Sequence, residues 1–238
     1  MHLSIIIPAY NESDRIRSTL VETMRYLDGQ GYKSEIVVVS DGSTDGTKES
    51  VEKAFGRSGK VSLKVLEYHP NRGKGYAVRY GMLRAGGAFI MFMDADYAVP
   101  IQEVEKGMVL LEKGADIAIA SRAIAGSVVE AHQNLFREMS AKIYTFIQNR
   151  YLGINYKDTQ CGFKIFRAEA AQELFQNQRL KSVIFDPEIL WLAKQHGFTV
   201  TEFPVYWRHI ENSRIVYDSF QKSLFVFQEL FRIKKLHR

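Results

Sequence analysis

Two aspartates, Asp94 and Asp96, stand two residues apart directly after the apolar run 88–93. The run predicts a buried strand, and side chains at alternate positions of an extended segment point to the same side. Two carboxylates placed in this way can share a hard divalent cation and leave coordination positions for phosphate oxygens. The pair therefore indicates a site for a nucleotide diphosphate, with a solvated acidic turn as the alternative.

Three further apolar runs, each typical of a strand, also lead to polar residues. The run 3–8 precedes Tyr10-Asn11-Glu12, the run 35–39 precedes Asp41-Gly42-Ser43, and the run 61–66 precedes Asn71-Arg72-Gly73-Lys74-Gly75. Polar groups thus recur where the predicted strands end.

Segments of helical length lie between these runs. The first shows helical spacing over 16–27 with Ser13 as a candidate N-cap, Thr44-Asp45 opens the second, and the third covers 76–83. Strands and helices that alternate about every 30 residues predict right-handed crossovers on a mostly parallel sheet, an α/β fold with helices on its flanks.

The predicted topology also predicts where a ligand binds. The carboxyl ends of parallel strands meet along one edge of the sheet, and ligands bind there. We therefore expect residues that are far apart in the sequence to line a single cleft, namely Glu12, Asp41, Arg72 and Asp94.

Composition favours one packed domain in a reducing compartment. The 238 residues are 46% hydrophobic, and no linker or low-complexity stretch divides them. The single cysteine, Cys161, excludes an internal disulfide and is expected to be a buried small side chain. Neither a secretion signal nor an apolar stretch of membrane-spanning length is recognisable, so we expect a cytoplasmic protein or one on the cytosolic face of a membrane.

Two common phosphate motifs do not fit. Gly73-Lys74-Gly75 resembles the start of a dinucleotide fingerprint, but Val78 occupies the third glycine position and the segment follows the third strand. No P-loop sequence is present. What remains is a basic helix start over 72–75, whose backbone N–H groups and charge suit an anion; a turn before a solvated basic helix is the alternative.

Seven motifs together resemble the family 2 glycosyltransferases with the GT-A fold, which is Rossmann-like. These motifs are 5–12, 39–47, 71–75, 94–96, 158–166, 185–190 and 202–207. The last three are similar to the dolichyl-phosphate β-glucosyltransferases and, more loosely, to the dolichyl-phosphate mannose synthases. The chain departs from the family pattern at Ser40, where an acidic residue is usual, and at Tyr97, where a small residue is common.

The resemblance implies a donor half at about 1–100 and an acceptor half at about 101–214. It implies a nucleotide-sugar site made of Pro8, Tyr10, Glu12, Asp41, Arg72, Lys74 and Asp94. Asp94 and Asp96 would hold Mg²⁺ or Mn²⁺ beside the pyrophosphate, and Asp96 and Asp158 are the catalytic candidates.

The type of acceptor decides which further groups are needed. A sugar hydroxyl needs a carboxylate base, whereas a lipid phosphate is already ionised and needs cations. Candidate phosphate-binding residues are Arg122, Arg137, Ser140 and Arg208, with ordinary surface ion pairs as the alternative for each arginine.

Two acidic segments keep two interpretations each. Asp158 either orients the donor sugar or the attacking group, or organises the turn before a strand through 163–165. Asp186-Pro187-Glu188 is typical of a helix start with Asp186 as N-cap, and direct substrate contact is the alternative.

The C-terminal segment 215–238 predicts a basic amphipathic helix. Its apolar stripe consists of Val216, Phe220, Leu224, Phe227 and Phe231, widened by Leu230, Ile233 and Leu236. Residues 219–238 carry a net charge of +4, close to the +5 of the whole chain. Such a helix suits an anionic membrane interface, and a helix at about 133–151 could add a second apolar surface; packing on the sheet or on another subunit, as in a homo-oligomer, is the alternative. Nucleic acid is not expected, since no base-reading motif accompanies the basic residues.

The sequence thus predicts metal-dependent, inverting transfer of a hexose to a polyprenyl or dolichyl phosphate. Glucose from UDP-glucose is the expected donor, and the expected place of action is the cytosolic membrane face. The alternatives are transfer to a saccharide or protein hydroxyl, a sugar-phosphate nucleotidyltransferase, and a non-catalytic nucleotide-sugar binding module.

Overall fold

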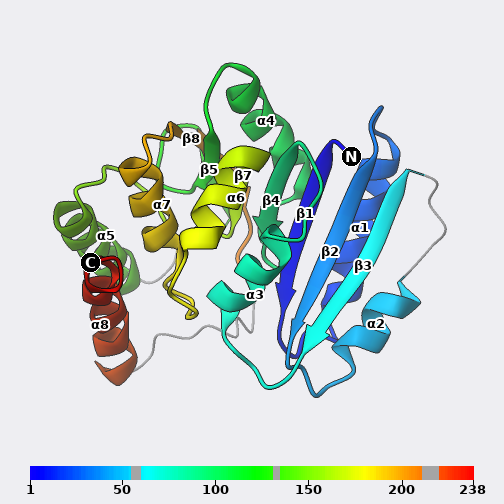
Figure 1. Cartoon of the computed structure of the whole chain (residues 1–238), viewed down its shortest axis with the longest axis horizontal. Helices are drawn as coiled ribbons and strands as arrows, with labels where there is room; N and C mark the ends of the chain where they lie inside the picture. Colours follow the sequence, from blue (N-terminus) through cyan, green and yellow to red (C-terminus); the bar gives the residue numbers. More distant parts are fainter. Residues whose placement is uncertain (55–59, 131–134, 211–219) are drawn as a thin grey trace.

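A seven-stranded sheet runs through the molecule (Figure 1). The computed structural model describes residues 1–54, 60–130, 135–210 and 220–238. The strands, in spatial order, are β3 (Val61–Tyr68), β2 (Ser34–Asp41), β1 (Leu3–Ala9), β4 (Phe89–Met93), β7 (Phe163–Arg167), β5 (Ile117–Ser121) and β8 (Val200–Pro204). Neighbouring strands are parallel except at β7, which is antiparallel to both β4 and β5. Short strands β6 (Val128–Val129) and β9 (Tyr206–Trp207) form a separate parallel pair.

Helices cover both faces of the sheet. One face carries α1 (Ile16–Asp28), α2 (Thr47–Lys53) and α4 (Val104–Glu112), which follows the 3₁₀ turn η1 (Ile101–Glu103). The other face carries α3 (Lys74–Met82), α6 (Ala168–Asn177) and α7 (Asp186–Gln195). Helices α5 (Leu135–Leu152) and α8 (Phe220–Leu236) pack beside α7, at the end of the molecule away from β3 (Figure 1). The predicted α/β fold with a mostly parallel sheet is confirmed.

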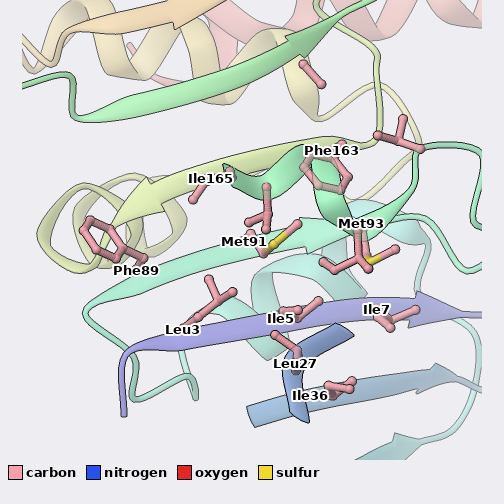
Figure 2. Close-up of a cluster of buried hydrophobic side chains, with 14 of the residues drawn as sticks. Leu3, Ile5, Ile7, Leu27, Ile36, Phe89, Met91, Met93, Phe163 and Ile165 are labelled. Atoms are coloured by element: carbon pink, nitrogen blue, oxygen red, sulfur yellow. The ribbon is translucent and has the colours of Figure 1, made fainter. Parts of the chain in front are cut away.

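The strands that look apolar throughout are buried on both sides, as the two helical layers require. Every residue of β1, β2, β4 and β5 is buried. In β1, Ile5 and Ile7 belong to the core under α1 and α4, whereas Ile6 belongs to the core under α3. Figure 2 shows the first of these cores, where β1 and β4 side chains meet Phe163 and Ile165 of β7.

Two predicted helix starts were wrong by two or three residues. Helix α1 begins after Arg15, and the Ser13 N–H donates to the Asp45 carboxylate at 3.0 Å. Helix α2 begins after Gly46, because the same carboxylate accepts the Thr47 N–H at 3.1 Å. Asp45 therefore ties the loop after β1 to the loop after β2, a long-range role that local capping rules cannot foresee.

Helix α8 is attached by part of its apolar surface. Leu230 and Ile233 are fully buried in the core shared with α7, and the rings of Phe227 and Phe231 contact Tyr144 and Tyr151 of α5. One side of the helix is thus explained by packing within the domain, which was the alternative to membrane contact. Val216 of the predicted apolar stripe lies outside the described residues. In the described part of the chain, no helix is long and apolar enough to cross a bilayer.

Gly81 lets α3 approach the centre of the sheet. A Cβ at this position would lie 2.4 Å from Ile6 Cγ2 and 3.0 Å from Val39 Cγ2. We expect Gly81→Ala to lower the free energy of unfolding by about 1–2 kcal/mol, since overpacking outweighs the gain of up to about 1 kcal/mol in helix propensity. Urea unfolding measures this loss. Gly31→Ala, where nothing lies within 4 Å of the added atom, is the control; equal stabilities for the two variants would contradict the prediction.

Candidate active site

An open cleft lies at the carboxyl ends of β1, β2 and β4. Its empty volume is about 960 Å³ including space open to solvent, enough for a nucleotide sugar. The lining residues are Pro8, Ala9, Tyr10, Glu12, Arg15, Asp41, Asn71, Gly73, Lys74, Ala77, Asp94, Ala95, Asp96 and Val183. The prediction that Glu12, Asp41 and Asp94 share one cleft is confirmed. Pro8, Tyr10, Lys74 and Asp96 also line it.

Arg72 does not line this cleft, and that part of the prediction was wrong. Its side chain is exposed, and its guanidinium carbon lies 4.8 Å from the centre of the Tyr76 ring and 5.7 Å from that of Tyr68. Its Nη1 donates to the Tyr76 hydroxyl at 2.6 Å. Attraction to the aromatic faces holds the cation beside the cleft.

Four backbone N–H groups around the start of α3 already donate to acceptors within the protein, contrary to the expectation that this helix start offers them to an anion. The N–H groups of Arg72 and Gly73 donate to the Asp41 carboxylate at 2.7 and 2.9 Å. Those of Gly75 and Tyr76 donate to carbonyl oxygens of Ser182 and Lys181, each at 3.2 Å. Asp41 and the chain at 181–182 thus satisfy the helix start, and the Lys74 side chain is left to face the cleft.

Lys74 forms an ion pair with Asp94, with Nζ 2.6 Å from Oδ1. Burial would lower the pKa of Lys74, but the charges of Asp94 and Asp186 outweigh it and raise that pKa above its ordinary value. Burial raises the pKa of Asp96, and the neighbouring Asp94 charge raises it further. The two carboxylates therefore repel each other in a partly desolvated place.

This pair fits a divalent cation. A Cβ on residue 162 would lie 2.0 Å from Asp94 Oδ2, so the glycine there keeps the side of the carboxylate open. Across the described ranges, no group of three or more His, Cys, Asp or Glu residues forms a metal cluster. Two carboxylates that leave further positions to water and phosphate oxygens match the way Mg²⁺ is bound beside nucleotides.

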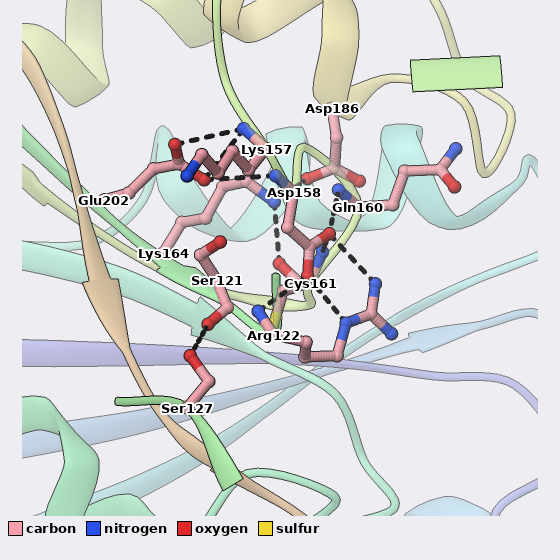
Figure 3. A network of polar contacts seen from close by, with 10 residues as sticks. All are labelled: Ser121, Arg122, Ser127, Lys157, Asp158, Gln160, Cys161, Lys164, Asp186 and Glu202. Atoms are coloured by element: carbon pink, nitrogen blue, oxygen red, sulfur yellow. Dashed lines mark hydrogen bonds and ion pairs between the residues drawn. The ribbon is translucent and has the colours of Figure 1, made fainter. Parts of the chain in front are cut away.

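Asp158 is buried and forms an ion pair with Arg122 (Figure 3). Its carboxylate accepts Arg122 Nε at 2.6 Å, Nη2 at 3.0 Å and the backbone N–H at 3.0 Å, as well as the N–H groups of Gln160 and Cys161. Burial opposes ionisation of Asp158, but the Arg122 charge and hydrogen bonds outweigh it and lower its pKa. The expectation that Asp158 organises the turn before β7 is confirmed, and its catalytic role stays a prediction.

A fully buried ion pair between β7 and the start of α7 was not predicted from the sequence. Lys164, fully buried in β7, places Nζ 2.5 Å from Asp186 Oδ1 and 2.7 Å from the Cys161 carbonyl oxygen. The prediction that Asp186 is the N-cap of α7 was therefore wrong, and Phe185 occupies that position. A lysine within the apolar run 163–166 was the available signal. Cys161 is 1% exposed, and burial raises the pKa of its thiol to about 12, in agreement with a packing role.

A smaller pocket shares Asp94 with the large cleft. Its empty volume is about 220 Å³, again including space open to solvent, and its lining residues are Met93, Asp94, Ala98, Val99, Gly162, Phe163 and Trp207. The Trp207 ring centre is 5.6 Å from the Arg122 guanidinium carbon. Asp94 thus lines both the large cleft and this smaller pocket, and Trp207 connects the smaller pocket to the Arg122–Asp158 pair.

The other predicted phosphate-binding residues lie further out. Arg208 is exposed, with its guanidinium carbon 5.6 Å from the Tyr206 ring centre, and its backbone N–H donates to the Ala98 carbonyl at 2.8 Å. Ser140 is exposed on α5. Neither residue lines the large cleft or the smaller pocket beside Asp94. The Arg137 side chain lies outside the described residues.

The sheet with one antiparallel strand and the acidic pair at the end of β4 define a glycosyltransferase with the GT-A fold. The chain belongs to glycosyltransferase family 2, whose model matches residues 4–175. It is 37% identical to the dolichyl-phosphate β-glucosyltransferase of Drosophila melanogaster over 90% of this chain and 69% of that one. It is 33% identical to the human enzyme of the same name over the same shares.

A solved structure of the same fold is glucosyl-3-phosphoglycerate synthase from Mycobacterium tuberculosis in complex with Mn²⁺, UDP-glucose and phosphoglyceric acid. Its TM-score is 0.69 at 15% identity, and the match covers 98% of this chain and 78% of that one. The predicted resemblance, fold and enzyme class are confirmed.

The Arg122–Asp158 pair makes stability depend on pH. Because folding lowers the pKa of Asp158 below its unfolded value of about 3.9, its stabilisation is present above that value and is lost as the pH falls through the folded pKa. At pH 7 we expect Asp158→Asn to cost about 3 kcal/mol, because Arg122 loses its partner. Urea unfolding should show the wild type and the variant converging as the pH falls below about 4. Glu112→Gln, on the exposed side of α4, is the control, and a difference that does not vary with pH would contradict the prediction.

Proposed function

We propose that this enzyme transfers glucose from UDP-glucose to a polyprenyl or dolichyl phosphate, with inversion at C1. The observation that carries the proposal is that Asp94 lines both a nucleotide-sized cleft and a smaller pocket, whose Trp207 lies beside the half-buried Arg122. The names of the curated relatives support the lipid phosphate and the glucose. The UDP-glucose complex of the structural neighbour supports the donor.

The residues of the large cleft suit a nucleoside diphosphate. Tyr10 is 46% exposed beside the cleft, so its ring can stack on a base, and Asp41 keeps the loop at 71–73 in place. Lys74 would meet the pyrophosphate as a point charge. Asp94 and Asp96 would hold Mg²⁺ or Mn²⁺, which when bound offsets the negative charge on the departing nucleoside diphosphate.

The surroundings of the smaller pocket beside Asp94 suit a phosphate acceptor better than a hydroxyl acceptor. Asp158, the nearest candidate for a base, has a lowered pKa and accepts several hydrogen bonds, so it is a weak proton acceptor. An ionised phosphate needs no base. Arg122 turns Nε and Nη2 to Asp158 and would meet the phosphate with Nη1, while Asp158 fixes the guanidinium plane.

Transfer itself is tested with labelled sugar nucleotides, Mg²⁺ or Mn²⁺, and polyprenyl phosphate. We expect an organic-soluble product with UDP-glucose, and a loss of roughly 100-fold or more for Asp94→Asn and for Asp96→Asn, because the leaving charge is no longer balanced. A chelator should have the same effect. Glu173→Gln, on the exposed side of α6, is the matched control.

Four outcomes would contradict the proposal. Full activity of the Asp94→Asn, Asp96→Asn double variant would remove the acidic pair from the mechanism. Activity of the wild type on a saccharide hydroxyl that is abolished in Asp158→Asn would favour a base-dependent hydroxyl acceptor. Release of pyrophosphate would favour a nucleotidyltransferase, and binding without turnover a binding module.

The outer faces of α5 and α8 are proposed to rest on the cytosolic surface of an anionic membrane. The two helices expose apolar residues: Met139, Ile143 and Phe146 on α5, and Leu224, Phe225, Phe231 and Leu236 on α8. Exposed cations lie on the same two helices or at their end, namely Lys142, Arg150, Arg232, Lys235 and Arg238. Apolar side chains bordered by cations are typical of helices in a lipid interface.

Vesicle sedimentation tests this surface. We expect the double variant Phe146→Ser, Phe225→Ser to bind vesicles containing an anionic phospholipid about tenfold less tightly or worse, because two exposed rings are lost, and salt to weaken the wild type. Val109→Ser, on exposed α4, is the control. Unchanged vesicle binding together with a loss of self-association would instead indicate that the face contacts another subunit.

A further inference from the structure

The chain at 178–183, which joins α6 to α7 and is called here the linking segment, contacts the start of α3. Its Ser182 and Lys181 carbonyls accept the N–H groups of Gly75 and Tyr76, each at 3.2 Å. Gln178 Nε2 donates to the Gly75 carbonyl at 2.9 Å. Val183, the last residue of the linking segment, lines the large cleft. The linking segment therefore holds the first turn of the helix that carries Lys74.

This contact leaves almost no room for displacement. A Cβ at Gly73 would lie 2.4 Å from the Lys181 carbonyl oxygen, and one at Gly75 would lie 2.8 Å from that of Ser182. The backbones of the linking segment and of α3 are thus packed directly against each other. Since close-packed backbone transmits displacement, a shift of one must move the other.

The opposite side of the linking segment is tied to α7 and α8. The Glu188 carboxylate, fully buried, accepts the N–H groups of Arg179 and Leu180, each at 2.8 Å, and its Oε1 lies 2.7 Å from His237 Nε2. Ser182 Oγ donates to Glu229 Oε2 of α8 at 2.7 Å. Glu229 is only 4% exposed, although it is a charged residue. A buried carboxylate is costly unless it is hydrogen-bonded, and Glu229 has two partners: Oε1 accepts from Arg232 of its own helix, and Oε2 accepts from Ser182 of the linking segment.

We infer that Glu229, acting through Ser182, is a positioning residue for Lys74. It fixes the linking segment, the segment fixes the start of α3, and the start of α3 sets the point from which the Lys74 side chain reaches Asp94. The inference rests on the proposed nucleoside diphosphate donor. It implies that α8 contributes to donor affinity as well as to attachment of the enzyme.

The test measures the affinity of the purified full chain for UDP in the presence of Mn²⁺ by calorimetry, without any acceptor. We expect Ser182→Ala and Glu229→Leu each to weaken UDP binding about fivefold, the effect of one hydrogen bond. Glu229→Gln keeps a carbonyl oxygen for Ser182 Oγ and should retain most of the affinity. In transfer assays the KM for the donor should rise more than kcat falls.

A double-mutant cycle separates positioning from general stability. In a Lys74→Ala background, Ser182→Ala should have no further effect on UDP affinity, because the group it positions is absent. Thermal melting checks folding of each variant, and Ser182→Ala, which removes one oxygen atom, carries the test if Glu229→Leu does not fold. Glu173→Gln is the matched control on α6.

Two outcomes would overturn the inference while leaving the donor proposal intact: a wild type that binds UDP no better than Ser182→Ala and Glu229→Leu, or losses that add fully to that of Lys74→Ala. A wild type that does not bind UDP with Mn²⁺ at all would overturn both.

Discussion

Mutual repulsion of two neighbouring carboxylates is the constraint around which this site is organised. Asp94 and Asp96 follow a fully buried strand, and the pKa of Asp96 is raised by burial and then by the charge of Asp94. Like charges in a partly desolvated place persist only where cations compensate them. Lys74 and Arg15 do so from two other elements, and a divalent cation bound with a substrate would do so more strongly. The acidic pair is thus held in a state whose repulsion a bound divalent cation would relieve.

Compensation continues away from the cleft as a chain of alternating charges. Lys74 feels both Asp94 and Asp186, and Asp186 is paired with Lys164, which in turn holds the carbonyl of Cys161. Beside it, Arg122 and Asp158 neutralise each other and order the same loop. Ion pairs this deep stabilise little relative to apolar packing, but removal of either partner is costly. Their effect is to fix the geometry of the loop at 158–162 against Asp94, where a Gly162 Cβ would already overlap the carboxylate.

The sequence predicted those features that depend on local pattern. Apolar runs located the strands, and the rule that parallel strands end at one edge correctly brought Glu12, Asp41 and Asp94 together. The motifs indicated the family. Features that depend on long-range contacts were missed or misplaced. Arg72 turns to two tyrosines, the N–H groups at the start of α3 are taken by Asp41 and the linking segment, and Asp186 binds a lysine from β7 instead of capping its own helix. No periodicity or capping rule contains the partners of Asp41 and Asp186, because each lies more than twenty residues away, and the contact of Arg72 with Tyr68 and Tyr76 is local but carries no motif that predicts it.

The same limitation applies to the outer helices, whose inner faces matter as much as their outer ones. An amphipathic pattern separates apolar from charged residues but does not say which apolar residues meet protein and which meet solvent. In α8, Leu230 and Ile233 turn inward with Glu229, while Leu224 and Phe225 turn outward. In α5, the buried Gln148 accepts the hydroxyl of Thr159, the residue after Asp158, while Phe146 is 70% exposed. Each helix therefore joins an exposed apolar face to one loop of the site, α5 on the side of Asp158 and α8 on the side of Lys74.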